Sequence, residues 1–105
     1  MLKIYDDMLM MIREVAPVIE TIAKRDTALA DQMRRAAQSV VLNAAEGLYS
    51  RGRNKGARLH TSLGSMRETL ACLEVGAAFG YIETPSPALL DRIDKILGTL
   101  WRLVH

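Results

Sequence analysis

Apolar residues recur at intervals of three and four along most of the chain, the spacing that places them on one face of an α-helix. Four stretches carry this pattern: about Lys3 to Lys24, Asp26 or Thr27 to about Tyr49, about Ala57 to Phe79, and Pro87 onward. No run of alternating β-branched residues indicates a strand. Because short breaks make successive helices antiparallel neighbours, the pattern predicts an all-α, antiparallel up-down-up-down four-helix bundle made by a single domain, residues 1–105. We expect roughly three-quarters or more of the residues to be helical, well above the usual share of about one third.

Residues that typically begin and end helices mark the breaks. Asp26 or Thr27 can cap the second helix, and Ser86 followed by Pro87 is suited to the start of the fourth. Gly80 is suited to the position after the third helix, where a left-handed backbone conformation is common. These signals support the boundaries of the predicted bundle.

Two segments leave helix boundaries open. Ser50 to Gly56 contains two glycines and an asparagine, which favours a turn, although this segment could also be partly helical. Pro17 lies inside the first helical pattern, where it should kink the helix near Glu14 or split it in two, because proline lacks a backbone N–H. Either outcome leaves the same four apolar faces.

Polar side chains line the second helix on the side opposite its apolar face. On a helix they fall within an arc of roughly 80°: Gln32, Arg35, Ser39, Asn43 and Glu46. Arg35 and Glu46 are too far apart to pair, and Glu68 on the third helix is a candidate partner for Arg35, within the chain or across an interface. For this polar row we favour a structural network, largely buried, over a small-molecule site, because buried polar groups normally satisfy one another.

Gly64 lies inside the third predicted helix. It weakens a helix by about 1 kcal/mol relative to alanine, which indicates the close approach of another backbone.

Composition restricts the class of protein. Half of the 105 residues are apolar, enough for a packed core. No apolar run approaches the ~18 residues needed to cross a membrane, and Asp6 and Asp7 stand where an export signal would have its basic and apolar regions. Cys72 is the only cysteine, which excludes an internal disulfide and suits a reducing compartment. We therefore expect a cytoplasmic protein that does not contact a membrane.

Positive charge is concentrated in one segment, although the net charge of the chain is only +2. Residues 47–67 carry five basic and no acidic side chains, whereas the remainder carries nine basic and twelve acidic ones. Four of these cations are candidates to contact the phosphates of RNA or DNA, because their charged groups suit phosphate: Arg51, Arg53, Lys55 and Arg58. The alternative is a solvated loop. Base stacking has little support, since Tyr49 is the only aromatic residue nearby.

Signatures of an enzyme are weak. Neither His60 nor His105 has a carboxylate three residues before it, as a di-metal carboxylate bundle requires, and one cysteine with two histidines gives too few ligands for a zinc site. No glycine-rich phosphate loop precedes a helix, so we predict no metal and no cofactor. Arg53-Asn54 followed by His60 resembles the motif of HEPN-type ribonucleases, in which the histidine serves as general acid or base. Here the motif crosses Gly56 and a predicted turn, which makes a ribonuclease the weakest interpretation.

Three motifs between Gln32 and Glu68 resemble a known family. They are Gln32-x-Arg34-Arg35-Ala36-Ala37-x-Ser39, Asn43-x-Ala45-Glu46-Gly47 and Gly64-Ser65-x-x-Glu68. In this order they are similar to motifs of the four-helix-bundle proteins encoded in ribosomal RNA intervening sequences, a group related to the accessory variability determinant of diversity-generating retroelements. The resemblance implies a small bacterial bundle that assembles as a homopentamer and has no known catalytic residues. For the retroelement relatives it implies two partners, nucleic acid and a reverse transcriptase, both bound through basic surface.

Self-association also has physical support apart from this resemblance. A lone bundle would expose Val18, Val75 and Phe79, an unusually apolar surface for a monomer. The leading hypothesis is a non-enzymatic homo-oligomer, preferably a pentamer, that acts as an accessory or scaffold protein and binds nucleic acid through its basic segment. The alternative is a protein-interaction module whose basic segment contacts an acidic protein partner. The ribonuclease is the third hypothesis.

Overall fold

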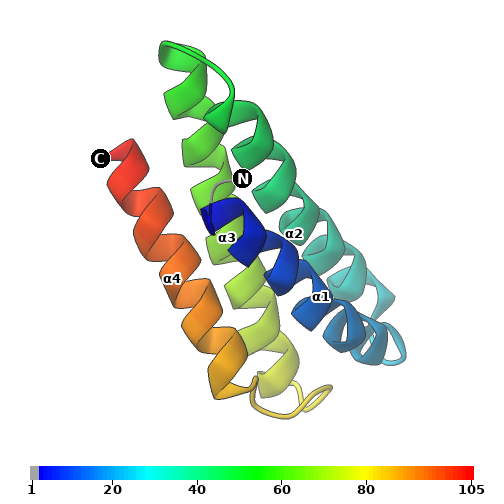
Figure 1. The fold of residues 1–105 in the computed structure, drawn as a ribbon. Helices are drawn as coiled ribbons and strands as arrows, with labels where there is room; N and C mark the ends of the chain where they lie inside the picture. The colour runs from blue at the N-terminus through cyan, green and yellow to red at the C-terminus, as the bar shows by residue number, and fades with distance from the viewer. Residues whose placement is uncertain (1–2) are drawn as a thin grey trace.

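The structure is a bundle of four antiparallel helices (Figure 1). It is a computed structural model and describes residues 3–105. The helices are α1 (Lys3–Ala23), α2 (Thr27–Leu48), α3 (Arg53–Ala78) and α4 (Pro87–Val104). They make up 84% of the described chain, in which there is no strand, so the predicted all-α fold and the expected helix content are confirmed. Each helix packs against the next, and α4 closes the bundle by packing against α1.

The starts of α2 and α4 are capped by the side chains that the sequence indicates. Asp26 accepts a hydrogen bond from the backbone N–H of Leu29 at 2.9 Å. Ser86 Oγ accepts one from the backbone N–H of Leu89 at 3.2 Å, and Pro87 follows as the first helical residue. Each cap satisfies one of the N–H groups that have no partner within the helix.

The end of α3 is closed by a left-handed glycine. Gly80 has a φ of 77°, and its N–H donates to the carbonyl of Ala77 at 3.0 Å. The N–H of Tyr81 donates to the carbonyl of Gly76 at 2.9 Å. These two bonds form the Schellman motif, in which a residue without a Cβ adopts the left-handed conformation at little cost. The predicted helix end at Gly80 is therefore confirmed.

The structure defines the two segments whose helix boundaries the sequence left open. The turn between α2 and α3 takes only residues 49–52, because Gly52 reverses the chain with a φ of 67° and α3 starts at once with Arg53. α1 continues through Pro17, so this helix is not split. The carbonyl that loses its N–H partner belongs to Arg13, four residues before the proline. Most of the basic segment, residues 47–67, is therefore helical.

Long apolar side chains fill the centre of the bundle. Methionines from α1, α2 and α3 are fully buried there: Met8, Met11, Met33 and Met66. α4 contributes Leu89, Ile93, Ile96 and Leu100. Unbranched thioether side chains adapt to irregular gaps between helices, so they complement the more rigid leucines and isoleucines.

α3 buries a wider face than its apolar pattern predicts. Small and polar residues of α3 are buried with the leucines: Ser62, Thr69, Cys72 and Gly76. The Ser62 hydroxyl donates to the carbonyl of Val40 at 2.7 Å, which satisfies it inside the core. Burial, and secondly the charge of Glu68, raises the pKa of the Cys72 thiol. A buried, protonated thiol is suited to packing rather than to nucleophilic chemistry.

α2 and α3 approach closely where Gly47 faces the start of α3. A Cβ atom at Gly47 would lie 3.0 Å from the side chain of Leu59 and 3.1 Å from Cβ of Arg58. Because Cβ of Arg58 is fixed to its backbone, relief of this contact would require α3 to move. A Cβ atom at Gly56 would meet nothing within 4 Å.

These two glycines give a matched pair of substitutions. We expect Gly47→Ala to lower the free energy of unfolding by about 1–2 kcal/mol, because the cost of overpacking exceeds the gain in helix propensity. Gly56→Ala should raise it by up to about 1 kcal/mol, because only the propensity changes. Urea unfolding followed by circular dichroism measures both. A stabilised Gly47→Ala variant would show that α2 and α3 can separate without loss.

A cluster of charges joins α1 to α4. Arg92 donates from Nε to Glu14 and from Nη1 to Asp7 Oδ1, the latter at 3.1 Å, and Lys95 Nζ lies 3.7 Å from Asp7 Oδ2. The side chain of Asp7 is 13% exposed and that of Arg92 is 26% exposed. The two carboxylates are thus partly withdrawn from water and depend on Arg92 to offset their repulsion. This cluster was not predicted from the sequence.

The contribution of the cluster to the free energy of unfolding can be compared with that of an exposed ion pair. Arg92→Met should lower the free energy of unfolding by about 2–3 kcal/mol, somewhat less than the ~3–5 kcal/mol of a fully buried pair. Arg34→Met removes contacts with Asp31 and Glu20 at the surface and should cost less than about 1 kcal/mol. Thermal and urea unfolding give both values. Equal losses for the two variants would mean that the cluster behaves as ordinary surface charge.

Candidate functional site

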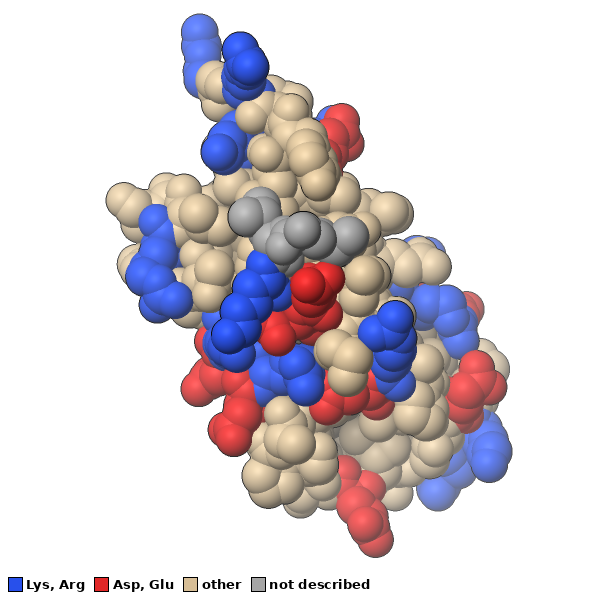
Figure 2. Space-filling model, in the orientation of Figure 1, with Lys and Arg blue, Asp and Glu red and all other residues tan. Residues whose placement is uncertain are grey.

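Three of the predicted phosphate-binding cations lie at the end of the bundle where α2 passes to α3. Arg51, Arg53 and Lys55 are exposed, and no carboxylate of the described chain lies within 4.0 Å of their charged nitrogens. Figure 2 shows basic side chains gathered at this end of the molecule. Gly52 caps α3 without a side-chain hydrogen bond, so no capping side chain occupies the first N–H groups of the helix. We call Arg51, Arg53 and Lys55 the basic tip.

Arg58, the fourth predicted cation, is engaged between α2 and α3. Its Nη1 donates to Asn43 Oδ1 at 3.3 Å, and its Nη2 lies 3.6 Å from Glu46 Oε1. The ion-pair partner of Glu46, which could not be assigned from the sequence, is therefore Arg58, a residue of the basic segment. Because Glu46 offsets its charge, Arg58 adds less than the basic tip to the local positive potential.

Ser39 of the predicted polar row and Ser65 of α3 continue this contact along the helices. Asn43 Nδ2 donates to the hydroxyl and to the carbonyl of Ser39, at 2.9 and 3.0 Å. The Ser65 hydroxyl on α3 donates to Ser39 Oγ at 2.7 Å. A hydrogen-bonded seam between α2 and α3 is therefore formed by Ser39, Asn43 and Ser65. Their polar atoms are hydrogen-bonded to one another within the single chain.

The rest of the predicted network is not buried in the single chain. Four of its members are exposed: Gln32, Arg35, Glu46 and Glu68. Arg35 and Glu68 do not come within ion-pair distance in the described chain, so of the two pairings that the sequence left open, the one within a single chain is not formed. At exposed positions water competes for both charges, and ordering two long side chains costs entropy. Gly64 also meets nothing within 4 Å, so pairing and close approach across an interface stay predictions.

The outer side of α3 carries small residues at heptad spacing, all of them exposed. Every seventh position is alanine or glycine, and the positions between are short or acidic: Ala57, Thr61, Gly64, Glu68, Ala71, Val75 and Ala78. We call these residues the α3 stripe. Phe79 follows it, and Leu42 on α2 is 66% exposed. The exposure of Val75 and Phe79 is as predicted, whereas Val18 is half-buried.

An aromatic cluster lies where the end of α4 meets α3. The ring of Trp101 stacks on that of His105 with centroids 3.6 Å apart, and the His60 ring lies 6.4 Å from His105. The cluster was not predicted, because base stacking was judged only from aromatic residues near the basic segment in sequence, of which Tyr49 is the only one. The signal was available, because an antiparallel pair that turns near residue 83 places residue 60 level with residue 105.

Arg53 and His60, the proposed ribonuclease pair, both lie on α3. The turn that was expected to interrupt the motif is therefore absent. Seven residues correspond to about 10 Å along a helix axis, so the two side chains emerge at separate points on an exposed surface. This arrangement adds nothing to the ribonuclease hypothesis beyond the spacing itself.

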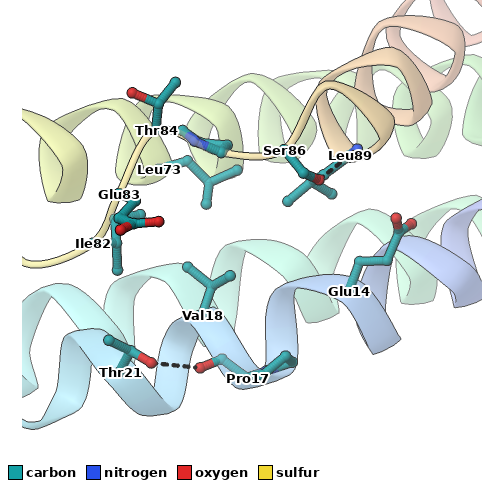
Figure 3. A pocket seen from close by; sticks show the side chains of 11 residues that line it. Glu14, Pro17, Val18, Thr21, Leu73, Ile82, Glu83, Thr84, Ser86 and Leu89 are labelled. Carbon is teal, nitrogen blue, oxygen red and sulfur yellow. Dashed lines mark hydrogen bonds between the residues drawn. The ribbon is translucent and has the colours of Figure 1, made fainter.

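A cleft of about 450 Å³ lies between α1 and the connection from α3 to α4 (Figure 3). Val18 and Leu73 contribute to its apolar walls. Two of its polar groups are hydrogen-bonded to helix backbone. The Thr21 hydroxyl donates to the Pro17 carbonyl at 3.1 Å, and Ser86 caps α4. We assign the cleft no catalytic role.

The described residues offer neither a metal site nor a membrane-spanning helix. Within residues 3–105, no group of three His, Cys, Asp or Glu side chains could hold a metal ion. None of the helices in this range is long and apolar enough to cross a membrane. The candidate features are thus the basic tip, the α3 stripe and the aromatic cluster.

A solved structure and a family model match this chain. No curated protein matches it. A crystal structure of a protein with unknown function from the S23 ribosomal protein family of Bacteroides thetaiotaomicron VPI-5482 matches with a TM-score of 0.85 at 17% identity, over 96% of this chain and 97% of that chain. At such low identity the match shows the fold alone. The model of the 23S rRNA-intervening sequence protein family matches residues 1–102, which confirms the resemblance drawn from the motifs. The chain therefore belongs to the 23S rRNA-intervening sequence protein family.

Proposed function

We propose that the chain is a non-enzymatic scaffold that self-associates and presents several copies of the basic tip to the phosphate backbone of a nucleic acid. The observation that carries the proposal is the tip itself, three exposed cations without a carboxylate partner in the described chain. The resemblance to ribosomal RNA intervening-sequence proteins and their retroelement relatives suggests five copies and a protein partner such as a reverse transcriptase.

The surroundings of the basic tip favour phosphate as its ligand. Lys55 and Arg53 lie in the first turn of α3, where the helix dipole adds positive potential. Charges this close together act jointly, because the Debye length is ~8 Å at physiological ionic strength. Phosphate contacts position a strand without reading its sequence, so the tip should show little sequence preference.

The α3 stripe favours a second copy of the chain as its partner. Apolar and small residues repeating every seven positions are typical of helices that pack against another helix. Gly64 has open space around it, so it allows a neighbouring backbone to come near. Arg35 and Glu68, exposed in the single chain, would gain partners if such an interface covered them.

Self-association can be tested at Gly64 without disturbing the fold of the chain. Gly64→Leu should weaken self-association about tenfold or more, because the added side chain keeps the neighbouring helix away. Gly56→Leu is the matched control, because Gly56 also faces open space and lies about 80° around the helix from Gly64. Light scattering across a concentration series measures the effect, and circular dichroism checks the helices. A wild-type chain that is monomeric at micromolar concentration would refute the proposed assembly.

The basic tip can be tested by reversing its charge. Arg51→Glu combined with Arg53→Glu should abolish binding of a single-stranded oligonucleotide and leave the thermal melt unchanged. Binding by the wild type should weaken with salt, with a log–log slope of about −2 per chain for three contacts at ~0.7 each. Arg13→Glu combined with Lys24→Glu is the control, because both residues are exposed and lie away from the tip. Fluorescence anisotropy at several salt concentrations gives all of these values.

The outcomes separate the proposed function from its alternative. Equal losses in the tip and control variants would show that only net charge matters and would remove the tip as the site. No binding by the wild type would favour the protein-interaction module, whose basic segment contacts an acidic protein.

A further inference from the structure

The aromatic cluster leaves a large indole ring accessible at the surface. Trp101 is 49% exposed, although one side of its ring is stacked on His105. His60 and His105 are also exposed. Tryptophan normally buries most of its large apolar surface, so an exposed indole beside two imidazole rings indicates a surface suited to a flat, unsaturated ligand.

Two arginines and a histidine on α3 form a row beside this cluster. Arg53, His60 and Arg67 are spaced by seven residues, which places them on one side of the helix. Arg53 belongs to the basic tip, and Arg67 is exposed with no carboxylate of the described chain within 4.0 Å. From Arg53 to Arg67 the row extends about 21 Å along the helix axis, a length comparable to several nucleotides.

We propose that His60, Trp101 and His105 form a stacking platform for the unpaired bases of a single-stranded nucleic acid, whose phosphates follow Arg53 and Arg67. The proposal rests on the proposed function, because the strand reaches the platform from the basic tip. Surfaces that bind single strands combine a basic track with aromatic rings on which bases stack. The cluster and the row supply these two components side by side.

A duplex does not fit this surface as well as a single strand. In a duplex the faces of the bases are covered by their neighbours, so only its phosphates could use α3. An unpaired strand exposes the faces of its bases, which every base presents regardless of sequence. The platform therefore selects unpaired structure rather than a particular sequence.

Trp101 is the only tryptophan of the chain, so its intrinsic fluorescence reports on the platform alone. The probes are a twelve-nucleotide oligothymidylate and an abasic deoxyribose-phosphate polymer of the same length. Oligothymidylate should quench the emission of the wild-type protein and the abasic polymer should not, because only the former can stack. Absence of quenching by bound oligothymidylate would overturn the platform.

Substitution of the indole separates stacking from charge. Trp101→Ala should weaken oligothymidylate binding about 5- to 150-fold and leave abasic polymer binding unchanged. Trp101→Phe keeps an aromatic ring, so its affinity for oligothymidylate should stay within about fivefold of the wild-type affinity. Leu103→Ala, which removes an exposed apolar side chain on the same helix, is the control and should change neither affinity. Thermal melts establish that each variant is folded.

The results distinguish this platform from the basic tip. Arg51→Glu combined with Lys55→Glu, which leaves the platform intact, should weaken the binding of both polymers. If Trp101→Ala binds oligothymidylate as the wild type does, the platform is refuted while the tip stands. If the wild type binds neither polymer, the platform and the proposed function both fail.

Discussion

The close approach of α2 and α3 is the constraint on which the rest of the structure depends. It is possible because Gly47 has no side chain to hold the helices apart and because the Ser62 hydroxyl is satisfied by a carbonyl of α2. Ser39 and Ser65 then come within hydrogen-bond distance across the pair. The two helices pack through small and polar side chains. The α3 stripe lies on the other, exposed side of α3.

The cations of the chain divide by their surroundings rather than by residue type. Arg92 is surrounded by two carboxylates and joins α1 to α4. Arg58 lies beside Glu46 and belongs to the contact between α2 and α3. Arg51 and Arg53 have no such partner in the described chain, so their charge acts outward. The distance from the nearest acid therefore separates structural arginines from candidate ligand-binding ones.

The features that could be predicted from sequence depend on neighbours along the chain. Helix periodicity and the ends at Asp26 and Gly80 are local, so the number and order of the helices were correct. The pairing of Arg58 with Glu46 depends on the register of two helices, which no local pattern fixes. The meeting of His60 with residues at the end of α4 likewise depends on how the antiparallel pair is aligned. The exposed Arg35 shows a further limit, because a polar row looks the same whether water or another chain covers it.

The four buried methionines have a consequence for how this fold changes in evolution. Their side chains bend at three bonds and accept new neighbours of different shape, so replacements elsewhere in the core can accumulate without moving the helices. The structural match at 17% identity with a TM-score of 0.85 shows that one arrangement of helices accommodates very different sequences. A core of this kind lets the interior drift while the surface is selected separately. This backbone can therefore persist while the sequences that form it diverge.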